Sequence, residues 1–530
     1  MPTLLTDFMA ARIPTIARLS KAEAQAYWLA TTTGDAKYEQ EYARAREELL
    51  HLLSNREDFQ TLAGIKGSPA AYEPLLRRQA DVLYNMYLAN QTDPTLISRL
   101  VQMETEVEST YTNFRAAYRG QAVTNNEIDH ILRVETDNLK RQHAWEASKQ
   151  IGVEVAEQVI ELVKLRNRIA RDLNFSNYQQ MELTLSEIDP EWLFTTLAEL
   201  KQLTDTPFRR LKEAEDAKLK KHFGVDQLMP WHYSDPFFQE VPATDELGLD
   251  DFLSNTNIAD LAAKYYTGIG LDTASILARS DLYERPGKNQ HAYCTDIDRA
   301  GDIRILCNVR NDEYWLSTLL HELGHGVYDL YHDSDLPFLL RTPAHTFTTE
   351  AIAMLMERQL ANPDWLTQIA EFDPHKAAQL EEKLTYRLAL GQLIFMRWGL
   401  VVVYFEQALY ANPEQDLNKL WWDLVEELQL VQRPPDRLTP DWAAKIHIAT
   451  APVYYQNYIL GALTASQLQT TLEKQFGSPL PVNDPGLGQY LIDRIFAPAA
   501  RYPWAEMLTK ATGESLSPRH FARQFIAVTK

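Results

Sequence analysis

The stretch EYWLSTLLHELGHGVYDL, residues 313–330, carries most of the information about the fold of this 530-residue chain. It is rich in apolar residues, and residues 311–313, Asn-Asp-Glu, form a natural helix start in front of it. His321 and His325 are four positions apart, so they lie one above the other on the same side of a helix. The sequence therefore predicts a largely buried helix with two histidines on one face.

The two histidines enclose Glu322 in the pattern His-Glu-x-x-His. The spacing lets His321 and His325 reach one tetrahedral Zn²⁺. Glu322 directly follows the first ligand, so it lies beside the water on the metal, takes a proton from it and later passes that proton to a leaving amine. The alternative is a pair of core histidines, but two that flank a glutamate would make an unusual core. We therefore predict one Zn²⁺ per chain and hydrolysis of amide bonds.

A catalytic zinc site needs three protein ligands and one open position. A histidine six residues after His325 is excluded because that position is Tyr331, and His332 is one residue away from it at the expected helix end. Residues 346–360, TFTTEAIAMLMERQL, are typical of a second helix with Glu350 in its first turn. We therefore predict Glu350, 350 − 325 = 25 residues after the second histidine, as the third ligand.

Glu357 is the alternative third ligand, because it lies on the same predicted helix. It is followed by Arg358, and this neighbour favours an exposed or ion-paired helix carboxylate. Glu350 therefore remains the predicted ligand.

The composition is that of a folded soluble protein, with 45% apolar and 24% charged residues. Lysine and arginine number 52 against 73 acidic residues, and the resulting charge of −21 argues against partners such as nucleic acid and anionic membrane surfaces. Cys294 and Cys307 are the only cysteines, which favours a reducing compartment. Arg12 and Arg18 interrupt the N-terminal apolar residues, so we expect no signal peptide and a cytoplasmic location.

Most of the chain has the pattern of amphipathic helices joined by short polar connections. Helix patterns cover residues 21–55, 76–91, 94–118, 128–175 and 190–223. Asp93 before Pro94 is a predicted helix cap, and Ser186-Glu187 is a weaker candidate. We therefore expect a mostly α-helical protein, with residues 1–530 in one large domain that has two lobes around a deep central cleft.

Two other segments differ from this helical pattern. Residues 388–409 are the most apolar stretch, but they contain Gln392, Arg397 and Glu406, so they predict a buried core helix instead of a membrane span. Residues 291–309 contain two short β-prone runs around the turn 299–302. They predict one small β-hairpin immediately before the helix with the two histidines.

Several motifs accompany the HELGH segment in a fixed order. They are residues 341–352 from Arg341 to Glu350-Ala-Ile, His291-Ala292 followed by Arg304-Ile305 and Cys307, Lys445-Ile-His447-Ile, and Tyr455-Gln-Asn-Tyr458. Together they resemble the angiotensin-converting-enzyme-like zinc peptidases and, more distantly, the thimet oligopeptidase and carboxypeptidase Taq groups. The resemblance covers roughly residues 22 to 460 and begins weakly at Ala26-Tyr27-Trp28.

The resemblance implies catalytic roles for two residues near the C-terminal end. Peptide hydrolysis generates an oxyanion, which needs hydrogen-bond donors in addition to a metal. Tyr458 is implied as the main donor and His447 as its partner. By spacing alone, Tyr454, Tyr455 and Tyr458 would instead be an aromatic helix face in the core. The tyrosine assignment carries a one-residue ambiguity, because the loop after His447 is longer here than in the family.

Substrate-binding roles follow from the same resemblance. His291 and the backbone of Ala292 would hold the substrate as an added strand. Lys445 and Tyr455 would bind the substrate's C-terminal carboxylate, so that two residues are released at a time.

Some positions depart from the family pattern. In the family, a glutamine joins the lysine at the terminal carboxylate of the substrate, and the best match places Tyr233 at that position. The family's chloride-binding arginine between the two tyrosines is Asn457 here. The family's disulfide would pair Cys307 with the position of Gln290, so it cannot form. These departures make peptidase activity a firmer expectation than dipeptide release or chloride activation.

A further departure concerns the residues around the metal ligands. In the family, an acid four residues after the third ligand orients one of the zinc histidines. Met354 occupies that position here. Another group must then orient that histidine, and Asp329 is a candidate.

The sequence thus predicts a mostly helical zinc peptidase that removes C-terminal dipeptides from short unfolded peptides. An oligopeptidase or metallocarboxypeptidase with the same zinc chemistry is the alternative within the enzymes. A zinc-containing protein that binds peptides without cutting them is the alternative of another class, and Glu322 argues against it because a binder needs no general base. The oligomeric state is not indicated.

Overall fold

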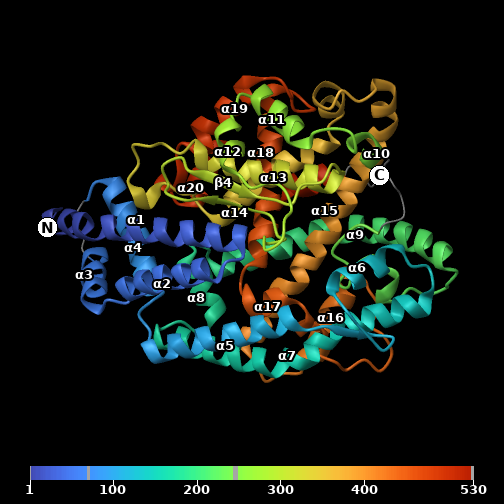
Figure 1. Cartoon of the computed structure of the whole chain (residues 1–530), viewed down its shortest axis with the longest axis horizontal. Coiled ribbons are helices and arrows are strands. Elements are labelled where there is room, and N and C mark those ends of the chain that lie inside the picture. Colours follow the sequence, from blue (N-terminus) through green and yellow to red (C-terminus); the bar gives the residue numbers. More distant parts are fainter. Residues whose placement is uncertain (1, 68–71, 243–248, 527–530) are drawn as a thin grey trace. The chain divides into compact units, whose positions relative to one another are not determined.

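The computed structural model describes residues 2–67, 72–242 and 249–526, and most of them lie in helices (Figure 1). The chain forms two compact units, each assembled from separate stretches of sequence. Unit 1 comprises Met1–Gln91, Leu247–Lys383 and Leu460–Ser517, and unit 2 comprises Thr92–Glu246, Leu384–Ile459 and Pro518–Lys530. The prediction of a mostly helical fold is confirmed, whereas the single domain with a deep central cleft stays a prediction.

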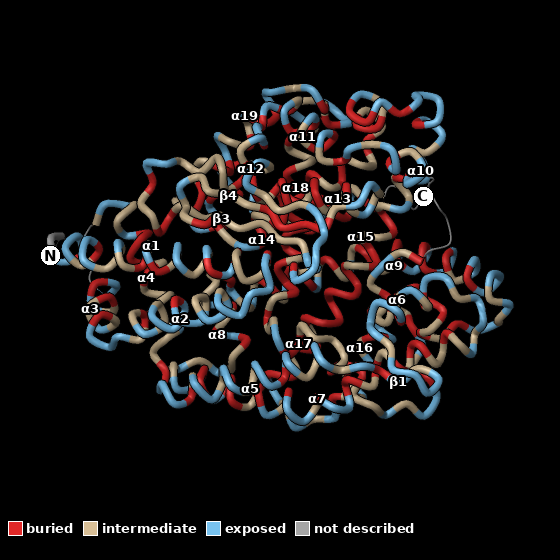
Figure 2. Tube along the Cα trace, viewed as in Figure 1, coloured by how far each residue is buried: buried red, intermediate tan, exposed pale blue. Residues whose placement is uncertain are grey.

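Unit 1 contains the predicted metal helix and the predicted hairpin. Its elements are α1 (Pro2–Thr33), α2 (Ala36–Leu53), α3 (Arg56–Lys66), α4 (Pro74–Leu88), α10 (Leu249–Leu253), α11 (Ile258–Gly268), α12 (Ala274–Arg279), β3 (Tyr293–Asp296), β4 (Ile303–Leu306), α13 (Glu313–Leu330), α14 (Thr346–Glu357), α19 (Pro485–Leu491) and α20 (Trp504–Thr512). Most residues of α14 and half of those of α13 are buried (Figure 2). They form the core on which the site is built.

Unit 2 is built from long helices and a second short hairpin. Its elements are α5 (Pro94–Asn113), β1 (Ala116–Tyr118), β2 (Gln121–Val123), α6 (Asn125–Val134), α7 (Asn138–Asp172), α8 (Tyr178–Leu185), α9 (Pro190–Phe223), α16 (Leu417–Gln429), α17 (Ile446–Thr450) and α21 (Pro518–Ile526). Helices α15 (Pro374–Ala411) and α18 (Tyr455–Phe476) contribute residues to both units.

Local capping explains where several helices begin. Asp312 accepts a hydrogen bond from the backbone N–H of Trp315 at 2.8 Å and so starts α13, as predicted. Asp93 and Pro94 start α5, also as predicted. Ser186 does not start a helix: it follows the end of α8, and Asp189 caps α9 instead. The error arose because Ser and Asp are both good caps, and only Asp189 is followed directly by proline.

Three predicted helices are shorter or divided in the structure. Residues 21–55 are interrupted at Gly34, whose φ of 67° ends α1. Residues 94–118 end as a helix at Asn113, and the hairpin of β1 and β2 follows. Residues 128–175 are divided because Asp137 caps a new helix, α7. Each break is a local turn or cap inside a region of continuous helical pattern.

The most apolar stretch of the chain lies in α15. By length and composition this helix could cross a membrane, but 72% of its most apolar window is buried inside the structure. Arg397 and Glu406 are buried in it as well, and Arg397 pairs with Asp205 at 2.6 Å. These features agree with the predicted core helix.

The hairpin of β3 and β4 precedes the metal helix, as predicted. The two strands are antiparallel, with Tyr293 opposite Leu306 and Asp296 opposite Ile303. The outer edge of β4 is covered by residue Asp281, whose backbone N–H donates to Ile305 at 2.9 Å and whose carbonyl accepts from the N–H of Cys307 at 2.9 Å. In the described part of the chain, no strand pairs with the outer edge of β3.

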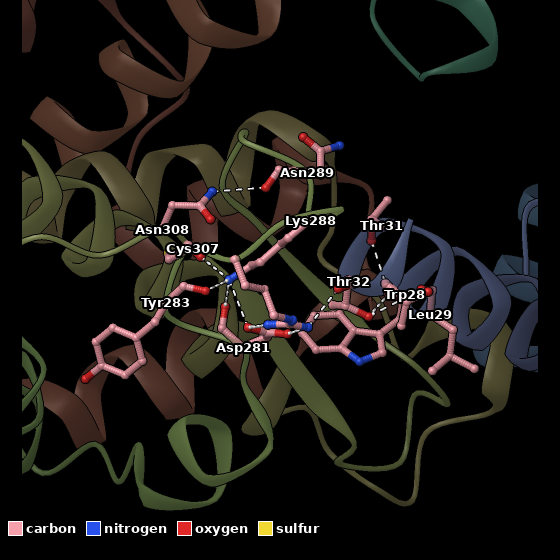
Figure 3. Close-up of polar contacts among 12 residues, drawn as sticks. Trp28, Leu29, Thr31, Thr32, Asp281, Tyr283, Lys288, Asn289, Cys307 and Asn308 are labelled. Atoms are coloured by element: carbon pink, nitrogen blue, oxygen red, sulfur yellow. Dashed lines mark hydrogen bonds and ion pairs between the residues drawn. The ribbon is translucent and has the colours of Figure 1, made fainter. Parts of the chain in front are cut away.

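A buried lysine anchors the hairpin without a disulfide (Figure 3). The Lys288 ammonium donates to the backbone carbonyls of Asp281 and Tyr283, each at 2.9 Å, and to that of Cys307. Both cysteines are free. Asn289, the residue after Lys288, donates its backbone N–H to the carbonyl of Thr31 at 2.8 Å and thereby attaches the segment to the end of α1. These hydrogen bonds hold the segment before β3 in place, and Cys307 forms no disulfide there.

Candidate metal centre

The predicted metal ligands come together in unit 1. The Nε2 atoms of His321 and His325 are 3.2 Å apart. An Oε2 atom of Glu350 lies 3.6 Å from Nε2 of His321 and 4.0 Å from Nε2 of His325. The three side chains therefore present one nitrogen or oxygen each to a common point, within 4.8 Å of one another.

Two glycines allow this arrangement. A Cβ atom on Gly324 of α13 would come within 2.7 Å of the Ala353 Cα on α14, so the two helices can approach only because this residue is glycine. A Cβ on Gly461 of α18 would meet the Glu350 Cβ at 3.0 Å. The close contact of α13 and α14 brings the carboxylate of Glu350 to the histidines, and Gly461 leaves room for it.

The outer nitrogens of both imidazoles are hydrogen bonded. Nδ1 of His321 lies 2.8 Å from a carboxylate oxygen of Glu357, and Nδ1 of His325 lies 2.7 Å from the hydroxyl of Thr349. A carboxylate only accepts, so His321 carries its proton on Nδ1 and turns an Nε2 lone pair inward. The same tautomer in His325, with Thr349 as acceptor, turns a second lone pair toward the first.

The two Nε2 atoms and the carboxylate oxygen are suitable ligand atoms for a divalent cation. Two lone pairs and a carboxylate oxygen that converge without a proton between them would repel one another unless a cation lay at their centre. Tetrahedral Zn²⁺ with nitrogens at 2.0–2.1 Å holds these atoms roughly 3.3 Å apart. The observed separation of 3.2 Å between the Nε2 atoms of His321 and His325 agrees with that geometry.

Glu357 is a paired helix carboxylate, one of the two forms expected from the sequence, but its close partner is His321. The sequence did not predict that Glu357 orients this ligand. Asp329, the sequence candidate for this role, lies 3.7 Å from His332 instead. Glu350 and Glu357 are seven residues, or two helical turns, apart, and this shared helix face was the signal that could have identified Glu357.

The electrostatics of the site favour positive charge. Burial lowers the pKa of His321, but the carboxylates of Glu357 and Glu350 outweigh this effect, so that its pKa is raised above the usual range. Burial, together with the charge of His321, lowers the pKa of His325 to about 4. The two carboxylates therefore favour a positive charge among these side chains, which a metal cation would supply.

Glu322 lies on α13 next to this cluster and is 7% exposed. Burial raises its pKa to about 7, with further contributions from Glu350 and Glu357. A bound dication would oppose this shift. A carboxylate that is buried beside a metal centre and whose pKa lies near neutrality has the properties of a general base.

His291 and Ala292 lie immediately before β3, in the same unit as the metal centre. His291 is exposed, Ala292 is half-buried, and the backbone N–H of His291 donates to the side chain of Asn289 at 2.9 Å. Both residues therefore border the strand edge that no described strand covers.

The remaining predicted site residues form a cluster in unit 2. The ring of Tyr455 lies 5.4 Å from the ring of His447 and 5.4 Å from that of Tyr458, measured between centroids. Tyr455 is buried and its hydroxyl accepts from the indole of Trp398 at 3.2 Å, whereas Tyr458 is half-buried. The ammonium of Lys445 lies 5.7 Å from the Tyr455 ring centre. The structure thus brings these four residues together within the unit.

A glutamine that sequence reasoning missed also lies in this cluster. Lys445 donates to the side-chain oxygen of Gln239 at 3.1 Å. The expected substitute, Tyr233, is buried elsewhere, where it accepts from Lys212 at 2.6 Å and donates to Asp216 at 3.1 Å. The sequence alone did not reveal this glutamine, because the loop 233–242 contains no periodic pattern that would place it beside Lys445.

Comparison with known proteins gives two family matches and several distant relatives. The profile described as "Peptidase family M3" matches residues 275–525, and the profile described as "Angiotensin-converting enzyme" matches residues 3–212. Angiotensin-converting enzyme of Rattus norvegicus is 26% identical over 275 residues, which are 49% of this chain and 21% of that protein. The enzyme of Theromyzon tessulatum is 23% identical over 294 residues, 52% of this chain and 47% of that protein.

A related protein named "Angiotensin-converting enzyme-related protein" from Drosophila melanogaster is 24% identical over 245 residues, 42% of this chain and 38% of that protein. The chain spans about a fifth of the length of the rat enzyme and less than half of that of the leech enzyme. The M3 match includes all three candidate metal ligands.

The two histidines of α13 and the glutamate of α14 have the ligand arrangement of gluzincin-type metallopeptidases, and both matching profiles describe peptidases of that kind. Its relatives are the angiotensin-converting enzymes and peptidase family M3, so the resemblance inferred from the ordered motifs is confirmed.

Proposed function

We propose that this metallopeptidase binds zinc, hydrolyses short peptides and releases C-terminal dipeptides from them. The observation that carries the proposal is the convergence of His321, His325 and Glu350, with the buried carboxyl of Glu322 beside them. Three protein ligands leave a fourth zinc position open, which is the arrangement of catalytic zinc sites and not of structural ones.

The residues divide the reaction between them. Zinc supplies an activated water and polarises the peptide carbonyl when it is bound. Glu322 takes a proton from the attacking water and gives it to the amine as the C–N bond breaks. Glu357 holds the tautomer that His321 needs as a ligand. Tyr458 and His447 are proposed to donate hydrogen bonds to the oxyanion that develops on the carbonyl.

The dipeptide preference is supported by the cluster around Lys445. Its ammonium lies 5.3 Å from the ring centre of Trp398 and 5.7 Å from that of Tyr455, and it donates a hydrogen bond to the neutral amide of Gln239. Burial lowers the pKa of Lys445 to about 8. A substrate carboxylate would compensate this buried charge and, as the end of the peptide, would limit the released product to a fixed length.

His291 and Ala292 are proposed to hold the substrate backbone along the free edge of β3. A cytoplasmic location is proposed as well, because the cysteines Cys294 and Cys307 are free and the charge is −21.

An oligopeptidase is the second candidate. The match to peptidase family M3 covers the part of the chain with the metal centre, whereas the angiotensin-converting-enzyme match covers residues 3–212, without any of the three ligands. The two candidates share the zinc chemistry and differ in the need for a free C-terminal carboxylate.

The experiment compares a seven-residue peptide as free acid and as amide, with the products identified by mass. Dipeptide release from the acid and at least about tenfold slower cleavage of the amide support the proposal. Equal cleavage of both forms at internal bonds would instead establish the oligopeptidase. Glu322→Gln must retain zinc and lose turnover, with Glu313→Gln on the same helix as the matched control; a Glu322→Gln variant with normal turnover would refute the mechanism.

A further inference from the structure

A cavity of about 410 Å³ lies in unit 1 at the end of the β3–β4 hairpin. Asp296, the last residue of β3, lines it together with the turn residues Ile297, Asp298 and Arg299. The opposite walls come from α1, α2 and the segment around Phe338. The free edge of β3 therefore leads directly to this cavity, which none of the residues of the metal centre lines.

Aromatic rings form part of the wall. Tyr27 of α1 and Tyr42 of α2 lie with their ring centres 5.4 Å apart, and Tyr27 is also 5.4 Å from the ring of Tyr293 on β3. Tyr27 is 38% exposed although it belongs to this cluster. The π faces of tyrosines attract cations, so this wall suits a positively charged group with an aliphatic stem.

The charged residues that line the cavity are three acids, Glu23, Asp296 and Asp298, and two bases, Lys21 and Arg299. Lys21 is paired with Asp298 at 3.0 Å, and the guanidinium of Arg299 lies over the Phe338 ring at 4.7 Å. Arg299 also acts electrostatically on Asp296, whose side chain accepts backbone N–H groups of the turn. The lining acids therefore exceed the lining bases by one.

Burial disfavours the charged form of Glu23 and Asp296, and the nearby guanidinium groups of Arg46 and Arg299 oppose this only in part. Burial therefore raises the pKa of Glu23, and it raises the pKa of Asp296 to about 6. Arg46 itself donates to the hydroxyl of Tyr42 at 2.8 Å. An added ammonium or guanidinium group would restore the balance, whereas an added carboxylate would increase the repulsion.

The length of β3 indicates which part of a peptide reaches the cavity. From His291 to Asp296 is a distance of five residues, or about 16 Å along an extended chain. If His291 and Ala292 hold the substrate near the cleaved bond, a substrate residue about three to five positions from that bond reaches the cavity. Only two residues lie on the C-terminal side of that bond when a dipeptide is released, so the cavity faces the N-terminal part.

We infer that this cavity binds a basic group, the side chain of lysine or arginine or the N-terminal ammonium, in the N-terminal part of the peptide substrate. Glu23 and Asp296 supply the negative charge, and Tyr27 and Tyr42 supply the aromatic wall. The inference rests on the proposed function, because it takes the peptide to lie along β3 with the cleaved bond near His291.

The test uses N-acetylated heptapeptides of alanine with one C-terminal sequence. Lysine, norleucine or glutamate is placed in turn three, four and five residues before the cleaved bond, and kcat/KM is measured for each peptide. A non-acetylated alanine peptide distinguishes the N-terminal ammonium from a lysine side chain as the bound group. A blocked tripeptide, too short to reach the cavity, reports on the proposed peptidase activity alone.

At one of the three positions we expect lysine to exceed norleucine by about tenfold in the wild type. The ratio of lysine to norleucine should fall to about threefold or less in Glu23→Gln, because a cation would then lose one buried counter-charge. It should not change in Glu39→Gln, an exposed acid of the same unit on α2. The ratio compares two peptides on one protein, so a partial loss of folded enzyme does not affect it.

Other outcomes would overturn the inference. A wild type that cuts the tripeptide but shows no lysine or N-terminal ammonium preference, or that prefers glutamate, would contradict the cavity's role while leaving the proposed function intact. An undiminished lysine preference in Glu23→Gln would also contradict it. Failure of the wild type with bound zinc to cut the tripeptide and every heptapeptide would overturn the proposed function, and the inference with it.

Discussion

The metal centre of unit 1 and the Lys445 cluster of unit 2 bury charge in opposite ways. In the first, the carboxylates of Glu350 and Glu357 surround two imidazoles and favour a cation. In the second, one ammonium lies among aromatic rings with a neutral amide as its hydrogen-bond partner, and its pKa is lowered to about 8. The sign of the buried charge indicates the ligand that each site suits: the first suits a dication. The ammonium of the second suits a carboxylate, because burial outweighs the opposing charges of Asp235, Glu240 and Asp129.

The largest effect in this comparison is expected from removing a metal ligand. Glu350→Ala should lower zinc affinity by more than about 100-fold, because even residues that only orient ligands contribute up to that factor. Turnover should be lost with the metal. Zinc content after dialysis against a chelator series measures the change, and Glu381→Ala, an exposed acid of unit 1, is the control. Full zinc occupancy and normal turnover in Glu350→Ala would require another third ligand.

Glu357→Gln should have a smaller effect on the same site. Glutamine still accepts a hydrogen bond from His321 but supplies no negative charge, so zinc affinity should fall roughly 10–100-fold. Zinc competition titrations measure this difference. At saturating zinc, a residual decrease in kcat would identify a role in catalysis in addition to the orientation of the ligand, and unchanged zinc affinity would show that the charge of Glu357 is not needed.

Replacing the cation of unit 2 tests the opposite case. Lys445→Met keeps the aliphatic stem between the rings and removes the charge, so KM for free-acid peptides should rise by roughly 30-fold, as expected for the loss of about 2 kcal/mol. KM for amidated peptides should change little. Lys419→Met, an exposed residue of unit 2 paired with Asp423, serves as the control. An equal rise in KM for both kinds of peptide would remove Lys445 from carboxylate recognition.

A third buried ionisable group, Glu406, has no proposed ligand and therefore extends the comparison. Glu406 in α15 accepts the backbone N–H of Val453 at 2.8 Å, and burial raises its pKa from 4.5 to about 8. Between these values the unfolded chain is ionised at this position and the folded chain is not. The free energy of unfolding therefore falls as the pH rises through this window.

Glu406→Gln removes this pH dependence and can keep the hydrogen bond to Val453. The difference in Tm between the variant and the wild type should therefore shift in favour of the variant by a few degrees between about pH 5 and about pH 8.5. In a protein of this size, 1 kcal/mol corresponds to about 2–4 °C or less. Thermal unfolding at both pH values measures it, with the exposed Glu154→Gln on α7 as control. A difference in Tm that is the same at both pH values would argue against a raised pKa of Glu406.

The sequence predictions were accurate where the residues of a site are close in the sequence, and incomplete where distant segments meet. His321, Glu322 and His325 occur within five residues of one helix, so helical periodicity alone places them together. Glu350 required a second helix, whose start at Thr346 could be recognised in the sequence. The structure places Glu350 just after the first turn of α14 and not, as predicted, in it. Gln239 was missed because it is 206 residues from Lys445 and lies in a loop without a repeating pattern.

The partners of the ligands also depended on tertiary packing. From the sequence, Asp329 was the candidate acid for orienting a zinc histidine, and Glu357 was considered only as an alternative ligand. The contact at Gly324 and Ala353 sets the distance between α13 and α14, so that His321 meets Glu357, while Asp329 lies beside His332. Similarly, the anchoring of the hairpin by the hydrogen bonds of Lys288 follows from three carbonyl groups that converge only in the folded hairpin.

The sequence by itself determined the helical class of this protein, the identity of its metal ligands and general base as candidates, and the hairpin before the metal helix. These features depend on periodicity, capping and short-range spacing, which act over a few residues. Tertiary structure alone decided which carboxylate orients His321, which amide accompanies Lys445, and where β3 ends in a cavity. Such pairings arise from the close packing of distant segments, and no local pattern in the chain encodes their distances.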